Sequence, residues 1–169
     1  FNDIANQFVW MEKHARDAKT GLLYHGWDES RQQRWANPVS GVSPHFWGRA
    51  MGWYAMALVD VLDYFPKEHP RRKEIIDILN RLVVAVEKVQ DKKTGCWYDI
   101  LDQPDRKPNY LEAWGSSMLV YAIAKGVRMG YVPASKLAIA QKGFEGIKKT
   151  FIKVENGQTN LQGTVKVSG

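Results

Sequence analysis

The chain has 169 residues, of which 44% are hydrophobic and 25% charged, and its formal net charge is +6 at pH 7. This composition fits one globular domain, and no apolar run reaches the roughly 18 uncharged residues of a membrane span. The single cysteine, Cys96, excludes an internal disulfide framework and a cysteine-based zinc site. The basic residues are scattered among acidic ones, so neither a nucleic-acid nor a membrane partner is predicted.

Apolar residues at a spacing near 3.6 predict helices over about residues 2–16, 44–65, 70–90, 110–129 and 135–152. Ser43 and Pro44 form the expected N-cap and first turn of the second helix. Asn109 with Glu112 resembles a capping box for the fourth helix. Gly130 stands where a left-handed residue is expected to end that helix.

The chain contains an internal repeat. DAKTGLLYH at 17–25 reappears as DKKTGCWYD at 91–99, and WGRAMGWYAMA at 47–57 reappears as WGSSMLVYAIA at 114–124. We therefore expect one domain over 1–169, with repeat units at about 1–65 and 70–130 and a third beginning near 135.

Repeated helix pairs bury their faces on their neighbours, which gives an open solenoid or a closed ring. The second helix of each pair is apolar nearly all round, and this favours an inner ring of helices with ligands bound at the loops of one mouth. The chain starts at Phe1 without an initiator methionine and ends in the alternating segment GTVKVSG. It is therefore predicted to be an internal piece of an all-α toroid, with only part of the ring present.

Arg49 and Trp53 are the first candidate site residues. They lie four residues apart and share one face of the second predicted helix, close to its N-terminus. A guanidinium group beside an indole suits a sugar ring that carries a carboxylate. The second repeat has Ser116 and Val120 at these positions, so the scaffold requires neither residue. The alternative is a buried arginine paired with an acid, with Trp53 in the core.

The segment LLYHGWDES at 22–30 supplies further candidates. His25 is replaced by Asp99 in the second repeat. It is suited to orienting a sugar hydroxyl or to relaying a proton, and the alternative is a structural hydrogen bond. Trp27 is interpreted as a sugar platform. Asp28 and Glu29 are adjacent and cannot flank one glycosidic bond, so Asp28 is predicted to be a loop acid.

Other catalytic signatures are absent, including GxGxxG, the Walker loop, GxSxG and HExxH. The four histidines, His14, His25, His45 and His69, show no metal-ligand spacing, so no metal or cofactor is predicted. Trp47 and Trp114 are matched by the repeat and are therefore expected in the core.

The stretches TGLLYHGWDES, SPHFWGRAMGWYAMALVDVL and GCWYDILDQPDRKPNYLEAWGSSMLVYAIAKGVRMGY resemble glycoside hydrolase family 105, the unsaturated rhamnogalacturonyl hydrolases. They are more distantly similar to the unsaturated glucuronyl hydrolases of family 88. The resemblance implies an (α/α)6 barrel that hydrates the C4=C5 bond of an unsaturated galacturonyl residue. It also implies that Arg49 and Trp53 hold the uronate, with His25 in the same site, and that the enzyme is cytoplasmic.

The resemblance places the catalytic aspartate upstream of Phe1, so no catalytic acid is assigned within the chain. Trp114 departs from the family pattern, because a small residue is expected there. Two other functions stay open: a sugar epimerase on the same barrel, and a non-catalytic helical-repeat protein that binds acidic sugars. The partner expected is an unsaturated oligosaccharide, and the sequence indicates no oligomeric state.

Overall fold

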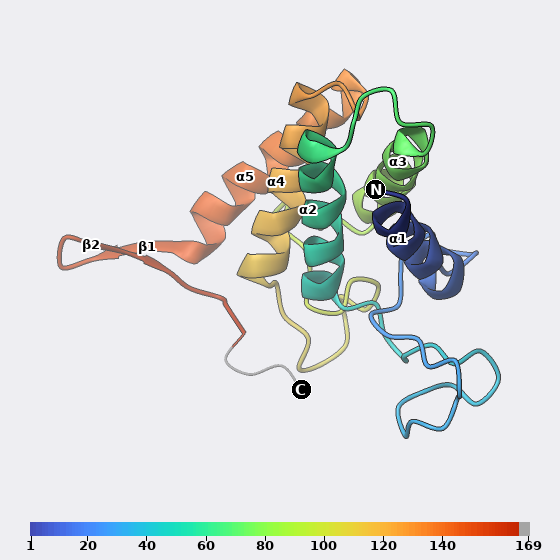
Figure 1. The fold of residues 1–169 in the computed structure, drawn as a ribbon. Coiled ribbons are helices and arrows are strands. Elements are labelled where there is room, and N and C mark those ends of the chain that lie inside the picture. The colour runs from blue at the N-terminus through green and yellow to red at the C-terminus, as the bar shows by residue number, and fades with distance from the viewer. Residues whose placement is uncertain (166–169) are drawn as a thin grey trace.

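The computed structural model describes residues 1–165 and is mostly helical. Its five α-helices are α1 (Asn2–Ala15), α2 (Gly48–Tyr64), α3 (Arg72–Lys88), α4 (Ala113–Arg128) and α5 (Leu137–Phe151), with a short 3-10 helix, η1 (Ala134–Lys136), before α5. Helix α2 packs against α4, which packs in turn against α5, while α3 contacts both α2 and α1 (Figure 1). Within the described residues, no helix is long and apolar enough to cross a membrane.

The all-α prediction needs one correction. Helix α5 is followed by an antiparallel ribbon of β1 (Ile152–Glu155) and β2 (Gln158–Leu161), which extends away from the helices (Figure 1). Asn156 and Gly157, with φ of 52° and 75°, form its turn. The sequence analysis predicted a third repeat beginning near 135 and no hairpin; the Asn-Gly pair between alternating residues was the overlooked hairpin signal.

The start of α2 was also predicted wrongly. Ser43 does not cap it, because its hydroxyl accepts from the Gly26 amide at 3.3 Å and lies 3.2 Å from Nδ1 of His25. Residues 44 and 45 form a bend, and the backbone at Trp47 is extended and forms a bridge with Ile100. The helix therefore begins at Gly48, four residues later than predicted.

The fourth helix has a different cap from the one predicted. Asn109 bonds to the loop, because its side chain accepts from the Ile100 amide at 3.0 Å and donates to the Ile100 carbonyl at 2.9 Å. Glu112 is itself the N-cap and accepts from the amides of Trp114 and Gly115. The predicted left-handed residue after this helix is confirmed, since Gly130 has a φ of 73°.

The Asp-x-Lys-Thr-Gly turns of the two repeats have the same hydrogen bonds. Asp17 accepts from the amide and hydroxyl of Thr20, both at 2.7 Å, and Asp91 accepts from Thr94 at the same two distances. The glycines that follow the threonines have φ of 79° and 81°, a region that favours glycine. Equal sequences therefore give equal turns, after α1 and after α3.

The core lies between α2, α4 and the helices beside them, and it includes Leu58, Leu79, Trp97, Leu119 and Ile123. Glycines let α2 and α4 approach closely. A Cβ on Gly52 would lie 2.8 Å from Cβ of Met118, and one on Gly115 would lie 3.1 Å from the carbonyl carbon of Gly48. This close approach brings the N-terminal ends of α2 and α4 together, where the candidate site lies.

Candidate active site

Arg49, in the first turn of α2, lies between two indole rings. Its ζ carbon is 5.0 Å from the ring centroid of Trp47, directly before α2, and 5.3 Å from that of Trp114, on α4. We name these three residues the arginine clamp. The prediction that both tryptophans are core residues is wrong, because Trp47 is only partly buried and Trp114 is 46% exposed. Both rings instead contact a cation, an arrangement that is favourable because the ring face is negative.

The second repeat supports this clamp. The indole Nε1 of Trp47 donates to Oδ1 of Asp99 at 3.1 Å. The buried carboxylate of Glu112 accepts from the backbone amide of Trp114 at 3.1 Å. Sequence reasoning did not identify Asp99 as part of the site, although its alignment with His25 in the repeat was a usable signal.

Tyr110 lies close enough to Asp99, Glu112 and Arg49 to be affected by their charges. Burial raises the pKa of the Tyr110 phenol, the negative charges of Asp99 and Glu112 raise it further, and the positive charge of Arg49 acts in the opposite direction. Tyr110 is therefore a neutral phenol, able to donate a hydrogen bond near the clamp. It was also missed at the sequence level, where nothing distinguished it from other loop residues.

A cavity of about 420 Å³ adjoins the clamp. His25 and Trp53 line it together, and Trp47 belongs both to its wall and to the clamp. Trp53 is 57% exposed, so the alternative that it fills the core is wrong. The structure thus joins three sequence candidates: two line one cavity, and Arg49 contacts a residue of its wall.

His25 is exposed and has a defined ring orientation. Its Nδ1 lies 3.3 Å from the carbonyl oxygen of His45 and 3.2 Å from the hydroxyl of Ser43, and its ring meets Trp47 edge to face at 5.7 Å. A neutral imidazole that donates through Nδ1 presents Nε2 as an acceptor. His25 is therefore suited to receiving a hydrogen bond from a sugar hydroxyl.

Trp27 is placed apart from these residues. It does not line the cavity, and its ring stacks on His14 of α1 with a centroid separation of 3.9 Å. Its indole Nε1 donates to the carbonyl of Ser40 at 3.1 Å. These contacts fasten the loop to α1, which is a supporting role.

Asp28 is surrounded by donors. The amide of Gln33 at 2.9 Å and the hydroxyl of Ser30 at 2.7 Å lower the pKa of the Asp28 carboxyl. Asp28 is consequently ionised near neutrality and has no proton to donate. These contacts agree with the expectation that it is a loop acid.

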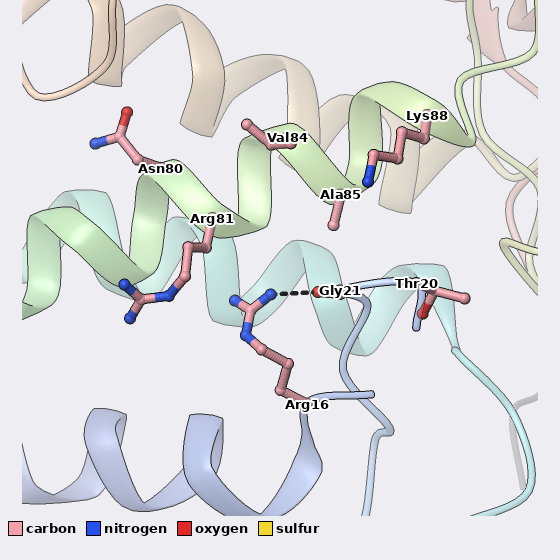
Figure 2. Close-up of a pocket in the computed structure, with 8 residues that line it drawn as sticks. All are labelled: Arg16, Thr20, Gly21, Asn80, Arg81, Val84, Ala85 and Lys88. Atoms are coloured by element: carbon pink, nitrogen blue, oxygen red, sulfur yellow. Dashed lines mark hydrogen bonds between the residues drawn. The ribbon is translucent and has the colours of Figure 1, made fainter. Parts of the chain in front are cut away.

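A second pocket, of about 360 Å³, lies between α1, α3 and the first Asp-x-Lys-Thr-Gly turn. Figure 2 shows the Arg81 and Arg16 side chains extending into the space between α3 and α1, where Nη1 of Arg16 donates to the Gly21 carbonyl at 2.5 Å. Glu12 accepts from Nε of both arginines, at 2.8 and 2.9 Å. Burial raises the pKa of Glu12, but the bonds from Arg81 and Arg16 outweigh this and lower it. Through Glu12, Arg81 therefore joins α3 to α1, and Arg16 holds the turn that follows α1.

Metal ligands are not gathered in the described part of the chain. Across residues 1–165, no group of three or more His, Cys, Asp or Glu side chains is placed to hold a metal ion.

Comparison with known proteins identifies the family. Residues 1–169 match the sequence profile described as Glycosyl Hydrolase Family 88. The chain belongs to this family. The resemblance predicted from the HGW and WGRAMGW segments is thereby confirmed.

Three relatives of this family 88 chain show the extent of the match. Protein Atu3128 of Agrobacterium fabrum is 37% identical over 154 residues, which are 88% of this chain and 65% of that protein. The unsaturated rhamnogalacturonyl hydrolase YesR of Bacillus subtilis is 34% identical over 82% of this chain and 38% of its own length. A solved C. acetobutylicum glycoside hydrolase of family 105 is 50% identical, with a TM-score of 0.97, over all of this chain and 47% of that one. The chain thus spans less than two thirds of these relatives.

Proposed function

We propose that the whole protein is a hydrolase that removes the Δ4,5-unsaturated galacturonyl residue from rhamnogalacturonan-derived oligosaccharides by hydrating the C4=C5 double bond. The observation that carries the proposal is the arginine clamp, which adjoins a cavity lined by His25 and Trp53. Membership of glycosyl hydrolase family 88 supports the reaction class. The similarity to YesR supports the choice of substrate.

Each proposed site residue has a distinct role. The planar guanidinium of Arg49 binds the sugar carboxylate through two parallel hydrogen bonds. The exposed indole of Trp53 stacks on the face of the sugar ring. His25 accepts a hydrogen bond from a ring hydroxyl through Nε2. Together these contacts orient an acidic ring, while Trp27 supports the loop.

The reaction needs an acid that protonates C4 and a water that adds at C5, after which the hemiketal collapses and releases the next sugar. We do not assign the acid to Asp28, because hydrogen bonds hold its carboxyl ionised. The part of the site proposed here binds and orients the acidic ring. A closed (α/α)6 barrel and a cytoplasmic location are part of the same proposal. No observation favours the epimerase or the non-catalytic binding protein.

An ultraviolet assay of the full-length protein tests the proposal, with unsaturated galacturonyl-rhamnose as substrate. Hydration destroys the conjugated enol ether, so its absorbance should fall. We expect Arg49→Ala to lower kcat/KM by at least about 30-fold, equivalent to ~2 kcal/mol for a lost charged hydrogen-bond partner. Arg128→Ala is the matched control, because Arg128 is the last residue of α4 and lies at the helix end away from the clamp. It should leave kcat/KM unchanged.

A second arm separates the carboxylate site from general damage to the protein. Arg49→Ala should weaken binding of uronate-ended sugars and leave that of neutral sugars unchanged. Equal losses for both would contradict the carboxylate assignment. A wild-type protein that leaves the absorbance unchanged would contradict the reaction itself.

A further inference from the structure

The two rings of the arginine clamp come from equivalent positions of the two repeats. Trp47 directly precedes α2, and Trp114 is the second residue of α4. In the first repeat the equivalent of Ser116 is Arg49, so the cation occurs once and is contacted by both tryptophans. The second repeat thus contributes a side chain to the site of the first.

Backbone packing explains how Trp114 reaches Arg49. A Cβ on Gly115 would lie 3.1 Å from the carbonyl carbon of Gly48 and 3.3 Å from the backbone nitrogen of Arg49. A larger residue than glycine at position 115 would separate the helix ends. The glycine therefore allows the preceding indole to lie against the guanidinium from the α4 side.

The Trp47 ring and the Trp114 backbone each have a support of their own. The Trp47 indole donates to Asp99, and the Glu112 carboxylate fixes the backbone at Trp114. A free arginine side chain samples many rotamers, and a ligand that must order it binds more weakly. Two ring faces in contact with the guanidinium reduce the number of rotamers open to Arg49 before the ligand arrives.

We propose that Trp114 is a positioning residue, which with Trp47 holds the Arg49 guanidinium in the orientation that receives a sugar carboxylate. This inference rests on the proposed function and adds the second helix pair to the recognition of the acidic ring. Trp114 acts through Arg49 and makes no contact with the reacting atoms. The contribution of Trp114 to binding affinity should require an aromatic ring at position 114 and a negative charge on the ligand.

The test compares Trp114→Leu with Trp114→Phe in the full-length protein. The probe is saturated galacturonyl-rhamnose, which lacks the double bond and is not hydrated, and its Kd is measured by titration calorimetry. We expect Trp114→Leu to raise Kd about fivefold, because the cation loses an aromatic face. Trp114→Phe keeps that face and should stay within about twofold of wild type.

Two controls isolate the effect. The methyl ester of the same disaccharide has no charge, so Trp114→Leu should change its Kd by less than about twofold. Phe144→Leu removes an aromatic ring that Lys148 contacts at 4.9 Å on α5, and binding of both sugars should be unaffected. Thermal unfolding of each variant checks that it is folded.

Equal losses in the Leu and Phe variants would assign Trp114 a packing role and overturn the inference. An equal loss for acid and ester, an unchanged Kd in Trp114→Leu, or a wild type that does not bind the saturated acid would also overturn it. The reaction is judged separately by the absorbance assay. A protein that binds the acid through Trp114 without hydrating the unsaturated sugar would support the clamp and contradict the proposed reaction.

Discussion

Lys125 shows how a single charge is held between the central helices. It is 9% exposed on α4, and its ammonium group contacts Asp60 at 2.7 Å and Asp63 at 2.5 Å, both on α2. Burial lowers the pKa of a lysine, but the hydrogen bonds to Asp60, Asp63 and Tyr121 outweigh this and raise it. The Lys125 side chain is therefore charged near neutral pH.

Replacing this lysine should destabilise the protein. Lys125→Met keeps most of the side-chain volume but leaves two carboxylates without their cation. Because those carboxylates are 41% and 36% exposed and water can rehydrate them, we expect a loss of only ~1–2 kcal/mol in the free energy of unfolding, measured with urea. Lys73→Met is the control: its side chain is 80% exposed beside Asp77, so the change should be within ~0.5 kcal/mol. Equal effects would contradict the argument.

The residues that could be predicted from the sequence are those that differ between the repeats. His25, Arg49 and Trp53 are unlike their counterparts in the second copy, and this difference separates them from the scaffold. Trp114 could not be found this way, because its match to Trp47 suggested a shared core role. Aligning the two repeats shows where Trp114 lies along its helix. It does not show that Trp114 contacts Arg49, because that contact depends on how closely α4 approaches α2.

At the scale of elements, the contact between α2 and α4 depends on small residues. Gly52 faces Met118 across it, and an added methyl group would lie 2.8 Å from the Met118 Cβ. Contacts this short force neighbouring atoms to move. The two helices can therefore approach this closely because glycines stand at their contact.

Gly52→Ala should therefore destabilise the protein, although alanine is the better helix former by ~1 kcal/mol. We expect a net loss of about 1–2 kcal/mol in the free energy of unfolding, because overpacking opposes the gain in helix propensity. Urea denaturation measures this loss. A more stable variant would show that α2 and α4 can separate without cost.

The helix interiors were predictable, and so was the start of α1, but the starts of α2 and α4 were not. Ser43 and Asn109 are good capping residues, yet their side chains bond to loop residues distant in the sequence. Competing partners of this kind are invisible to a local pattern. They moved the start of α2 to Gly48 and left Glu112 to cap α4.

At the scale of the whole molecule, carboxylates join α1 to α3 and stabilise the turns that follow these two helices. Thr20 donates to Asp17 and lowers its pKa below 3.8. Burial raises the pKa of Asp91 and of Glu12, but the bonds from Thr94 and from Arg81 outweigh it. These carboxylates are more acidic folded than unfolded, so the stability they supply is complete above their ordinary pKa values and is lost as the pH falls.

The free energy of unfolding should therefore decrease as the pH is lowered below about 5. The double variant Thr20→Val and Thr94→Val removes the hydroxyl donors of both turns, so its decrease should be shallower. Thr159→Val, in the exposed strand β2, is the control and should follow the wild type. Urea denaturation at a series of pH values measures the slopes, and parallel curves for all proteins would contradict the assignment.

The arginine clamp also couples ligand binding to the packing of α2 against α4. Its cation belongs to α2 and one of its rings to α4, so the oriented guanidinium exists only while these two helices are docked. A ligand that requires that orientation binds the docked arrangement in preference to any opened one, and mass action then shifts the equilibrium toward docking. An acidic sugar should accordingly raise the temperature at which α2 and α4 separate, and the same coupling makes any mutation that loosens their contact weaken binding.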